Sequence, residues 1–342
     1  MKLLRLPSFV RRSIIFVLLP VTVGLLTSIL ILFFLCFAFG FLLSNFTSSP
    51  ENAFLRFYRV IAMIVWYLFM ECVGLLAAAA LWLITCCGLF RNLRWSQQLH
   101  GKIQYVWTTG VLFGVRVFLN GKINFPDCSA LRSGPMVIIS QHRSFFDACI
   151  PSVLVGKAKG KIVLRHILKS ELLLSPSLDL FGHRLPNYFV TRQSSKSAKE
   201  IDAIRSLGLG LDNDACVIFP EGTFYSKRRF SASLTEIEKT DTDRLLRVQK
   251  LKHVLPIRTG GILALLDATP GADLVVIGHS GFEKFSSFQE IFRNVPFTSP
   301  IHLTLKRVPH TEIPATDRDK VKFLDDLWHS VDLWNEEIRQ FS

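Results

Sequence analysis

The sequence predicts an α/β fold with a central sheet and flanking helices, preceded by an N-terminal membrane region of two helices. Three observations lead to this fold class. Apolar residues are concentrated before residue 92, short apolar runs alternate with helix-like stretches after it, and the C-terminal segment keeps helical spacing. In this chain of 342 residues, 49% of them hydrophobic, residues 1–94 are the expected membrane region. Residues 95–342 are the expected α/β domain.

The membrane region contains two long apolar runs. No charged residue lies between Ser13 and Pro50, and the run from Val60 to Phe90 is interrupted only by Glu71. About 20 apolar residues suffice to cross the core of a bilayer, so the sequence predicts two spans, near residues 13–45 and 60–90. A carboxylate is costly in hydrocarbon. Glu71 is therefore expected near the helix–helix contact, or at a point that splits the second run into an interfacial and a spanning part. A shallower, partly interfacial hairpin is the alternative to the two spans.

Positive charges flank this region on its outer sides. They are Lys2, Arg5, Arg11 and Arg12 before the first run, and Arg91, Arg94 and Lys102 after the second. Because cytoplasmic segments of membrane proteins carry an excess of Lys and Arg, both termini and the α/β domain are expected in the cytoplasm. The formal charge of +13 fits an anionic lipid surface, and the sequence has no nucleic-acid-binding motif. We expect the bilayer, and not nucleic acid, as a partner.

Short, largely apolar runs in the second part predict the strands of the sheet. They cover residues 136–140, 188–191, 215–219, 274–277 and 301–305. Such runs are typical of strands that are covered on both faces. Residues 197–209 and 324–338 have helical spacing, and the last helix is expected to pack against the sheet, with the membrane surface as the alternative. The polar segment 227–250 is expected to be an exposed excursion.

The first motif follows the strand at 136–140, where His142 and Asp147 occur in the run His-Arg-Ser-Phe-Phe-Asp. An Asp about one helical turn beyond a His can approach it. A carboxylate that accepts a hydrogen bond from one ring nitrogen fixes the tautomer of the ring. The other nitrogen is then free to act as a base near neutral pH. The spacing therefore predicts a catalytic pair.

A second motif, Glu221-Gly222-Thr223, comes at the end of the strand at 215–219, and Arg192 follows another strand. A glycine in a turn lets backbone amides approach a ligand closely. The Thr hydroxyl can add a hydrogen bond, and Glu221 can orient a hydroxyl or a basic side chain. A simple turn is the alternative interpretation of this motif.

A third motif, residues 254–262, combines Pro256 and Arg258 with two glycines. The guanidinium of Arg258 could bind a phosphate. A separate basic run follows the first motif and has two interpretations. It is either a solvated face or a surface that steers an anionic donor or rests on phospholipid headgroups. The run consists of Lys157, Lys159, Lys161, Arg165 and Lys169.

In order and spacing across roughly residues 130–265, these motifs resemble the glycerolipid acyltransferase family, the PlsC-like group with a His-x4-Asp motif. The resemblance implies that His142 deprotonates the acceptor hydroxyl and that Asp147 supports the histidine. The hydroxyl oxygen would then attack an acyl thioester directly. The resemblance implies neither a metal nor a cofactor, and it implies acyl-CoA or an acyl carrier protein as the donor substrate.

The resemblance also implies binding roles. In the family, an arginine and the Glu-Gly-Thr motif hold the acceptor phosphate, and the proline motif shapes the donor site. Gln141 stands where the family usually has Asn, and Phe224 where many members have Arg, so a nearby arginine such as Arg228 or Arg229 is a candidate replacement. The candidate acceptor-binding residues are Arg192, Glu221, Gly222, Thr223, Arg228 and Arg258, and the candidate donor-binding residue is Pro256.

The expected function is therefore that of a membrane-bound O-acyltransferase. It would move a fatty acyl group from an acyl thioester to a lysophospholipid hydroxyl, with a 1-acylglycerol-3-phosphate as the first choice of acceptor. Phe224 leaves the acceptor open. One alternative is a remodelling acyltransferase for another lysolipid, such as lysophosphatidylinositol or a lyso-aminolipid. A second alternative, from a different class, is a catalytically degenerate membrane lipid-binding protein.

Overall fold

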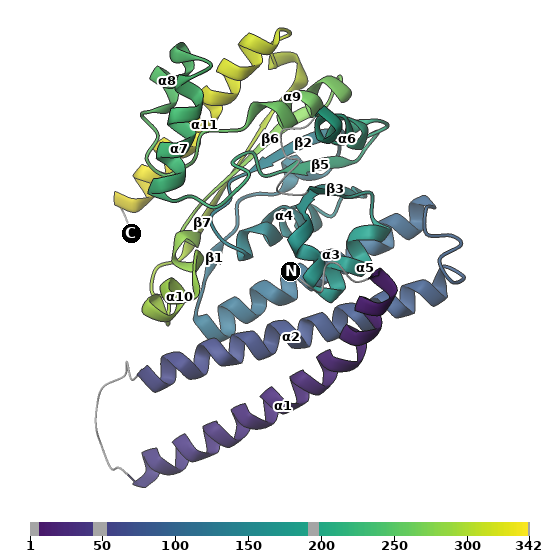
Figure 1. The fold of residues 1–342 in the computed structure, drawn as a ribbon, viewed down its shortest axis with the longest axis vertical. Helices are drawn as coiled ribbons and strands as arrows, with labels where there is room; N and C mark the ends of the chain where they lie inside the picture. The colour runs from purple at the N-terminus through teal and green to yellow at the C-terminus, as the bar shows by residue number, and fades with distance from the viewer. Residues whose placement is uncertain (1–6, 44–52, 191–197, 341–342) are drawn as a thin grey trace. The chain divides into compact units, whose positions relative to one another are not determined.

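The computed structural model describes residues 7–43, 53–190 and 198–340. They form two compact units whose segments alternate along the chain (Figure 1). The first comprises Met1–Lys122, Glu171–Arg184 and Ser287–Pro300, and the second comprises Ile123–Ser170, Leu185–Ser286 and Ile301–Ser342. The first unit therefore takes in helix α3 (Arg94–Leu119) and two later segments, as well as the two apolar helices.

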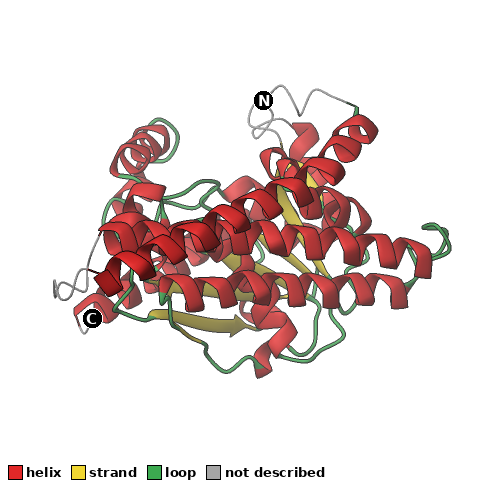
Figure 2. Cartoon of the chain, turned by 90° about the horizontal axis from the view of Figure 1, so that it is seen from below, coloured by secondary structure: helices red, strands yellow, loops and turns green. Residues whose placement is uncertain are grey.

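The first unit is helical. α2 packs against both α1 and α3, and Figure 2 shows these long helices side by side. α1 and α2 are long and apolar enough to cross a membrane, by length and composition alone. α2 ends six residues before the expected end of the second span, in turns where Cys86 and Cys87 have positive φ. The helices are α1 (Ser8–Leu43), α2 (Ala53–Ile84), α3 (Arg94–Leu119), α5 (Pro176–Arg184) and α10 (Phe288–Asn294).

Glu71 has polar partners at the start of α5. Its carboxylate is 1% exposed and accepts hydrogen bonds from Ser175 Oγ at 2.7 Å and from the backbone N and Oγ of Ser177 at 2.9 and 2.8 Å. Gly74, one turn further along α2, permits this close approach, because a Cβ there would lie 2.7 Å from the Cβ of Ser177. Glu71 therefore lies at the contact of α2 with the start of α5, a helix that the sequence did not predict.

The second unit confirms the expected α/β fold. Its sheet has the order β1-β7-β6-β2-β5-β3-β4. Among the strand pairs of the described residues, only β6–β7 is antiparallel. β2 lies in the middle, where Met136 pairs with Ala215 of β5 and with Asp273 of β6. The strands are β1 (Ile123–Asn124), β2 (Met136–Ser140), β3 (Leu164–Lys169), β4 (Tyr188–Val190), β5 (Ala215–Ile218), β6 (Asp273–Ser280) and β7 (Ile301–Val308).

Helices cover both faces of this sheet. Val137 and Ile139 of β2 share one core cluster with residues of α9 and α11, including Leu265 and Trp328. Figure 1 shows α4 on the other side of the sheet from α9 and α6. The C-terminal helix therefore packs against the sheet, as expected. The helices of this unit are α4 (Ile150–Lys157), α6 (Ala198–Gly208), α7 (Lys227–Glu238), α8 (Thr242–Val248), α9 (Thr259–Ala268) and α11 (Asp317–Gln340).

Candidate active site

His142 and Asp147 meet just beyond the carboxyl end of β2. The chain turns directly after Ser140, and a short 3-10 helix, Phe146–Cys149, returns the carboxylate to the ring. His142 Nδ1 lies 2.9 Å from Asp147 Oδ1, while Asp147 Oδ2 accepts the backbone N–H groups of Arg143 at 2.5 Å and Ser144 at 2.6 Å. A carboxylate can only accept in these contacts, so the hydrogen of the neutral ring is on Nδ1. Nε2 of His142 then carries a lone pair.

The electrostatic state of Asp147 matches this arrangement. Its side chain is completely buried, and burial alone raises the pKa of a carboxyl group. The charges and hydrogen bonds of His142 and His279 act in the opposite direction and lower the pKa of Asp147 well below its usual range. The carboxylate therefore stays ionised at neutral pH and can support a positive charge on His142.

Two phenylalanine rings pack against His142. The ring centroids of Phe219 and the imidazole are 4.6 Å apart. Those of Phe224 and the imidazole are 4.4 Å apart, in an edge-on arrangement. Phe224, which departs from the family pattern, thus forms part of the wall around His142. Arg229 donates to the carbonyl of Phe224 at 2.9 Å, and Arg228 is exposed on α7. Neither observation places a guanidinium beside His142.

Glu221 and Gly222 lie next to the first motif. Glu221 Oε1 is 3.5 Å from the backbone N of His142, and the side chain is 1% exposed. Burial raises the pKa of Glu221 to about 8, although Arg143 and the backbone N–H groups of His142 and Leu255 act against this rise. Gly222 has a φ of +67°, and a Cβ there would lie 3.1 to 3.2 Å from the side chain of Arg258. The second and third motifs therefore meet at this turn.

The remaining predicted residues occupy different settings. Thr223 is half-buried in the turn after Gly222, and Pro256 is buried in the segment before α9. Arg258 is exposed, and its backbone N–H donates to the carbonyl of Pro220 at 2.9 Å. Arg192 lies outside the described residues.

Two residues of this region were not singled out from the sequence. Arg143 is 7% exposed, its guanidinium carbon lies 4.2 Å from the centre of the Tyr225 ring, and its Nε has no hydrogen-bond partner among the described residues. His279 contacts Asp147 from β6. The position of Arg143 inside the first motif was the available signal for it, whereas His279 stands far away in the sequence without a motif.

Cys149 is not available as a nucleophile, although it lies two residues beyond Asp147. It is 5% exposed, and burial, together with the charge of Asp147, raises the pKa of its thiol to about 12. Because the thiolate is the reactive form, Cys149 is a residue of the core and not a nucleophile.

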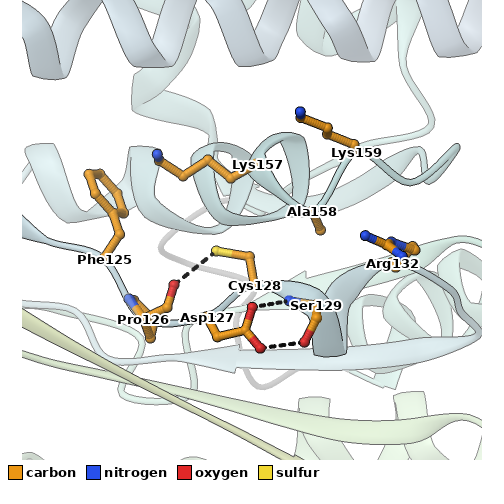
Figure 3. Close-up of a pocket in the computed structure, with 9 residues that line it drawn as sticks. All are labelled: Phe125, Pro126, Asp127, Cys128, Ser129, Arg132, Lys157, Ala158 and Lys159. Atoms are coloured by element: carbon orange, nitrogen blue, oxygen red, sulfur yellow. Dashed lines mark hydrogen bonds between the residues drawn. The ribbon is translucent and has the colours of Figure 1, made fainter.

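The basic run divides into separate environments. Arg165 donates to the carbonyls of Leu207, Leu209 and Gly210, and Lys169 Nζ lies 5.7 Å from the Phe224 ring. Lys157 and Lys159 line a hollow of about 490 Å³ whose other residues include Arg132 and Phe125 (Figure 3). The segment 129–132 precedes β2, so this hollow belongs to the amino end of the strand, whereas His142 follows the carboxyl end.

The fold and the site together define an α/β protein with a buried histidine–carboxylate pair at the carboxyl edge of its sheet. Residues 116–269 match the sequence profile of the Acyltransferase family. This segment contains β2, β5, the His142–Asp147 pair and the turn at Gly222. Over this segment the chain is similar to the acyltransferase family, and the match supports the family expected from the motifs.

Among solved structures, the chain is similar to PlsC from Thermotoga maritima, a 1-acyl-sn-glycerophosphate (LPA) acyltransferase. The two share 14% sequence identity, and the alignment covers 79% of this chain and 98% of that chain with a TM-score of 0.46. The comparison with curated protein sequences finds no match.

Proposed function

We propose that the protein is a membrane-associated O-acyltransferase that moves a fatty acyl group from an acyl thioester to a hydroxyl of a lysophospholipid. The observation that carries this proposal is the hydrogen bond of 2.9 Å between His142 Nδ1 and the buried Asp147. It leaves Nε2 of His142 as the base in a family whose reaction is acyl transfer. The neighbouring turn at Gly222 and the side chain of Arg258 supply groups for an anionic acceptor.

The proposed reaction needs one base and no covalent enzyme intermediate. Nε2 of His142 takes the proton of the acceptor hydroxyl while the oxygen attacks the thioester carbonyl. The carbon–sulfur bond of the tetrahedral intermediate then breaks, and the departing thiolate receives the proton from the His142 imidazolium. The products are an ester and a free thiol. Asp147 remains ionised throughout and stabilises the imidazolium.

Release of the free thiol gives a direct test. The purified full-length protein, supplied with acyl-CoA and lysophosphatidate, is expected to release CoA in step with diacyl product. His142→Ala should lower kcat by about 10²- to 10⁴-fold, the usual contribution of a general base. Cys149→Ala serves as the matched control, because the buried thiol has no part in the proposed reaction. Unchanged CoA release by His142→Ala would refute the assignment of the base.

A second acceptor class is favoured by the wall around His142. Phe224 packs at 4.4 Å against the imidazole, where many family members are expected to carry an arginine. Lysophosphatidylinositol and lyso-aminolipids are the corresponding alternatives. Lipid profiles of membranes with and without the protein, followed by kcat/KM on each purified lysolipid, would rank these acceptors. Binding of lysolipids without any thiol release would instead support a degenerate lipid-binding protein.

Membrane attachment through α1 and α2 is part of the proposal. α1 and α2 have the length and hydropathy of membrane spans, and the flanking cations favour cytoplasmic termini and a cytoplasmic catalytic domain. The donor would then be acyl-CoA or an acyl carrier protein, both of which are available on that side, and no metal or organic cofactor enters the reaction. Acyl-CoA and acyl carrier protein can be compared directly as donors in the thiol-release assay.

A further inference from the structure

His279 lies against the carboxylate oxygen of Asp147 that His142 does not use. It belongs to β6, and its side chain is completely buried. Its Nε2 is 3.4 Å from Asp147 Oδ2 and 3.1 Å from the carbonyl oxygen of Gln141. A carbonyl oxygen can only accept a hydrogen bond, so Nε2 of His279 carries the hydrogen. The N–H group therefore donates to the carbonyl of Gln141, and the same nitrogen lies 3.4 Å from Asp147 Oδ2.

Gln141 binds both the backbone and the ring of His279. Its Oε1 accepts the backbone N–H of His279 at 2.9 Å, and its backbone carbonyl accepts Nε2–H at 3.1 Å. Gln141 is itself fixed, because its backbone N–H donates to Ile277 at 3.0 Å and its Oε1 accepts from Asn335 at 3.3 Å. An asparagine at this position is one methylene shorter and would not make the Oε1 contact in this geometry.

From these contacts we infer that His279 is a positioning residue for the His142–Asp147 pair, held in place by Gln141. This inference rests on the proposed acyl transfer. Asp147 is fixed from both oxygens: Oδ1 by the ring of His142, and Oδ2 by two backbone N–H groups together with His279. His279 links the end of β6 to the turn that follows β2, which are neighbouring strands in the sheet.

The expected effect of His279 follows from its place behind Asp147. Without its N–H group and its volume, the carboxylate can rotate, and His142 Nδ1 loses part of its fixed acceptor. The base is then less often in its productive orientation, which lowers kcat. Substrate binding does not involve His279 directly, so KM should change little.

Two substitutions of His279 separate positioning from packing. Leucine removes the N–H donor, whereas glutamine can place an amide N–H near the position of Nε2. We expect His279→Leu to lower kcat by about 10- to 100-fold, since a misplacement of about 1 Å in a reacting group can cost about 100-fold. KM should stay within about twofold, and His279→Gln should recover most of the loss in kcat. His166→Leu is the matched control, because His166 is also a buried histidine of the sheet, on β3, and its polar neighbours are Ser152 and Asn187.

The ring of His142 provides a readout that does not depend on activity. In wild-type protein with ¹⁵N-labelled histidine, Nδ1 of neutral His142 is expected to carry the proton, and the signal is assigned by its loss in His142→Ala. His279→Leu should shift this signal toward a mixture of tautomers, whereas His166→Leu should leave it unchanged. An unchanged His142 signal and wild-type kcat in His279→Leu would overturn the inference while the acyl-transfer assay still stands.

Other outcomes are equally decisive. Equal losses of kcat in His279→Leu and His279→Gln, with an unchanged His142 signal, would show that His279 only fills space. If the wild-type protein releases no thiol with any lysolipid, the proposed function fails, whereas the spectrum of His142 still decides whether His279 positions the pair.

Discussion

Glu221 is a carboxyl group in an unfavourable place for a charge. It is almost completely buried, and its Oε2 has no hydrogen-bond partner among the described residues. Burial raises its pKa to about 8 in the folded protein, against an ordinary value of 4.5. Glu221 therefore keeps its proton at neutral pH, and its carboxyl group can donate a hydrogen bond as well as accept one.

This raised pKa predicts a pH-dependent stability. Between pH 4.5 and 8 the unfolded chain has released the proton of Glu221 while the folded protein keeps it, so stability falls as pH rises through this window. The glutamine of Glu221→Gln cannot ionise. The melting temperature of the variant minus that of the wild type should therefore increase as pH rises from 4.5 to 8. Glu283→Gln is the matched control. Burial raises and Arg339 lowers the pKa of Glu283, with a net lowering. The difference in melting temperature between Glu283→Gln and the wild type should stay constant above pH 4.5 and become smaller below it.

At the scale of single residues, the sequence predicted contacts between site residues that are close together along the chain. His142 and Asp147 are five positions apart, and their contact follows from one turn of chain. Gln141 and His279 are 138 positions apart, and their contact depends on β2 and β6 being neighbours, which spacing does not reveal. The unusual Gln141 was visible in the sequence, but its partner was not.

α11 fastens the segment that carries the third motif. Asp332 is 3% exposed and accepts the backbone N–H groups of Lys252, His253 and Val254 at 2.6 to 3.1 Å. One turn earlier, Trp328 Nε1 donates to the carbonyl of Leu255 at 3.0 Å. The buried ion pair between Arg244 and Asp325 adds a further attachment, since Arg244 also donates to the carbonyl of Ile257.

Removal of this carboxylate should loosen the segment. Asp332→Ala leaves three backbone N–H groups without their acceptor, and we expect a loss of about 2–4 kcal/mol in the free energy of unfolding. Catalytic efficiency should fall as well, because Pro256 and Arg258 follow directly. Asp326→Ala removes an exposed carboxylate from the same helix and should change stability by less than about 0.5 kcal/mol. Denaturant unfolding compares the two variants, and equal stabilities would contradict this role for Asp332.

At the scale of elements, the apolar runs in the sequence predicted most strands of the sheet. The predicted runs correspond to β2, β4, β5, β6 and β7. β3 was missed, because Arg165, His166 and Lys169 interrupt its apolar pattern. Within the strand, the guanidinium of Arg165 donates to backbone carbonyls at the end of α6, a long-range compensation that local composition does not show. The polar excursion at 227–250 proved to contain two helices, α7 and α8.

For the whole molecule, the division into units was the least predictable feature. A boundary at residue 94 was expected, whereas the helical unit also recruits α3, Glu171–Arg184 and Ser287–Pro300. Polar contacts explain part of this recruitment. Arg12 of α1 pairs with the buried Asp179 of α5 at 3.1 Å, and Glu71 of α2 binds the start of the same helix. α5 is short, and no long apolar run marks it as a partner of α1 and α2.

The proposed topology predicts the side of the membrane on which each segment is accessible. Single cysteines at Ser8 and Ser342 should react with an impermeant thiol reagent only after the cytoplasmic face is opened, in a variant whose native cysteines have been replaced. Ser48→Cys, at a position between the two apolar runs of the sequence, is the matched control. It should react without opening in the two-span arrangement. Protection of Ser48 from the outside would favour the shallower hairpin.

The partners of Glu71 also set an order of events during synthesis. Ser175 and Ser177 follow Glu71 by 104 and 106 positions, so they leave the ribosome long after α2 has emerged. Until then the carboxylate, which interrupts the apolar run 60–84 of α2, lacks the hydroxyl and amide groups that bind it in the folded protein. We expect the final depth of α2 in the bilayer to be reached only after α5 has folded. Insertion of this helix would then be completed after translation of the segment that holds it, and not when the helix first meets lipid.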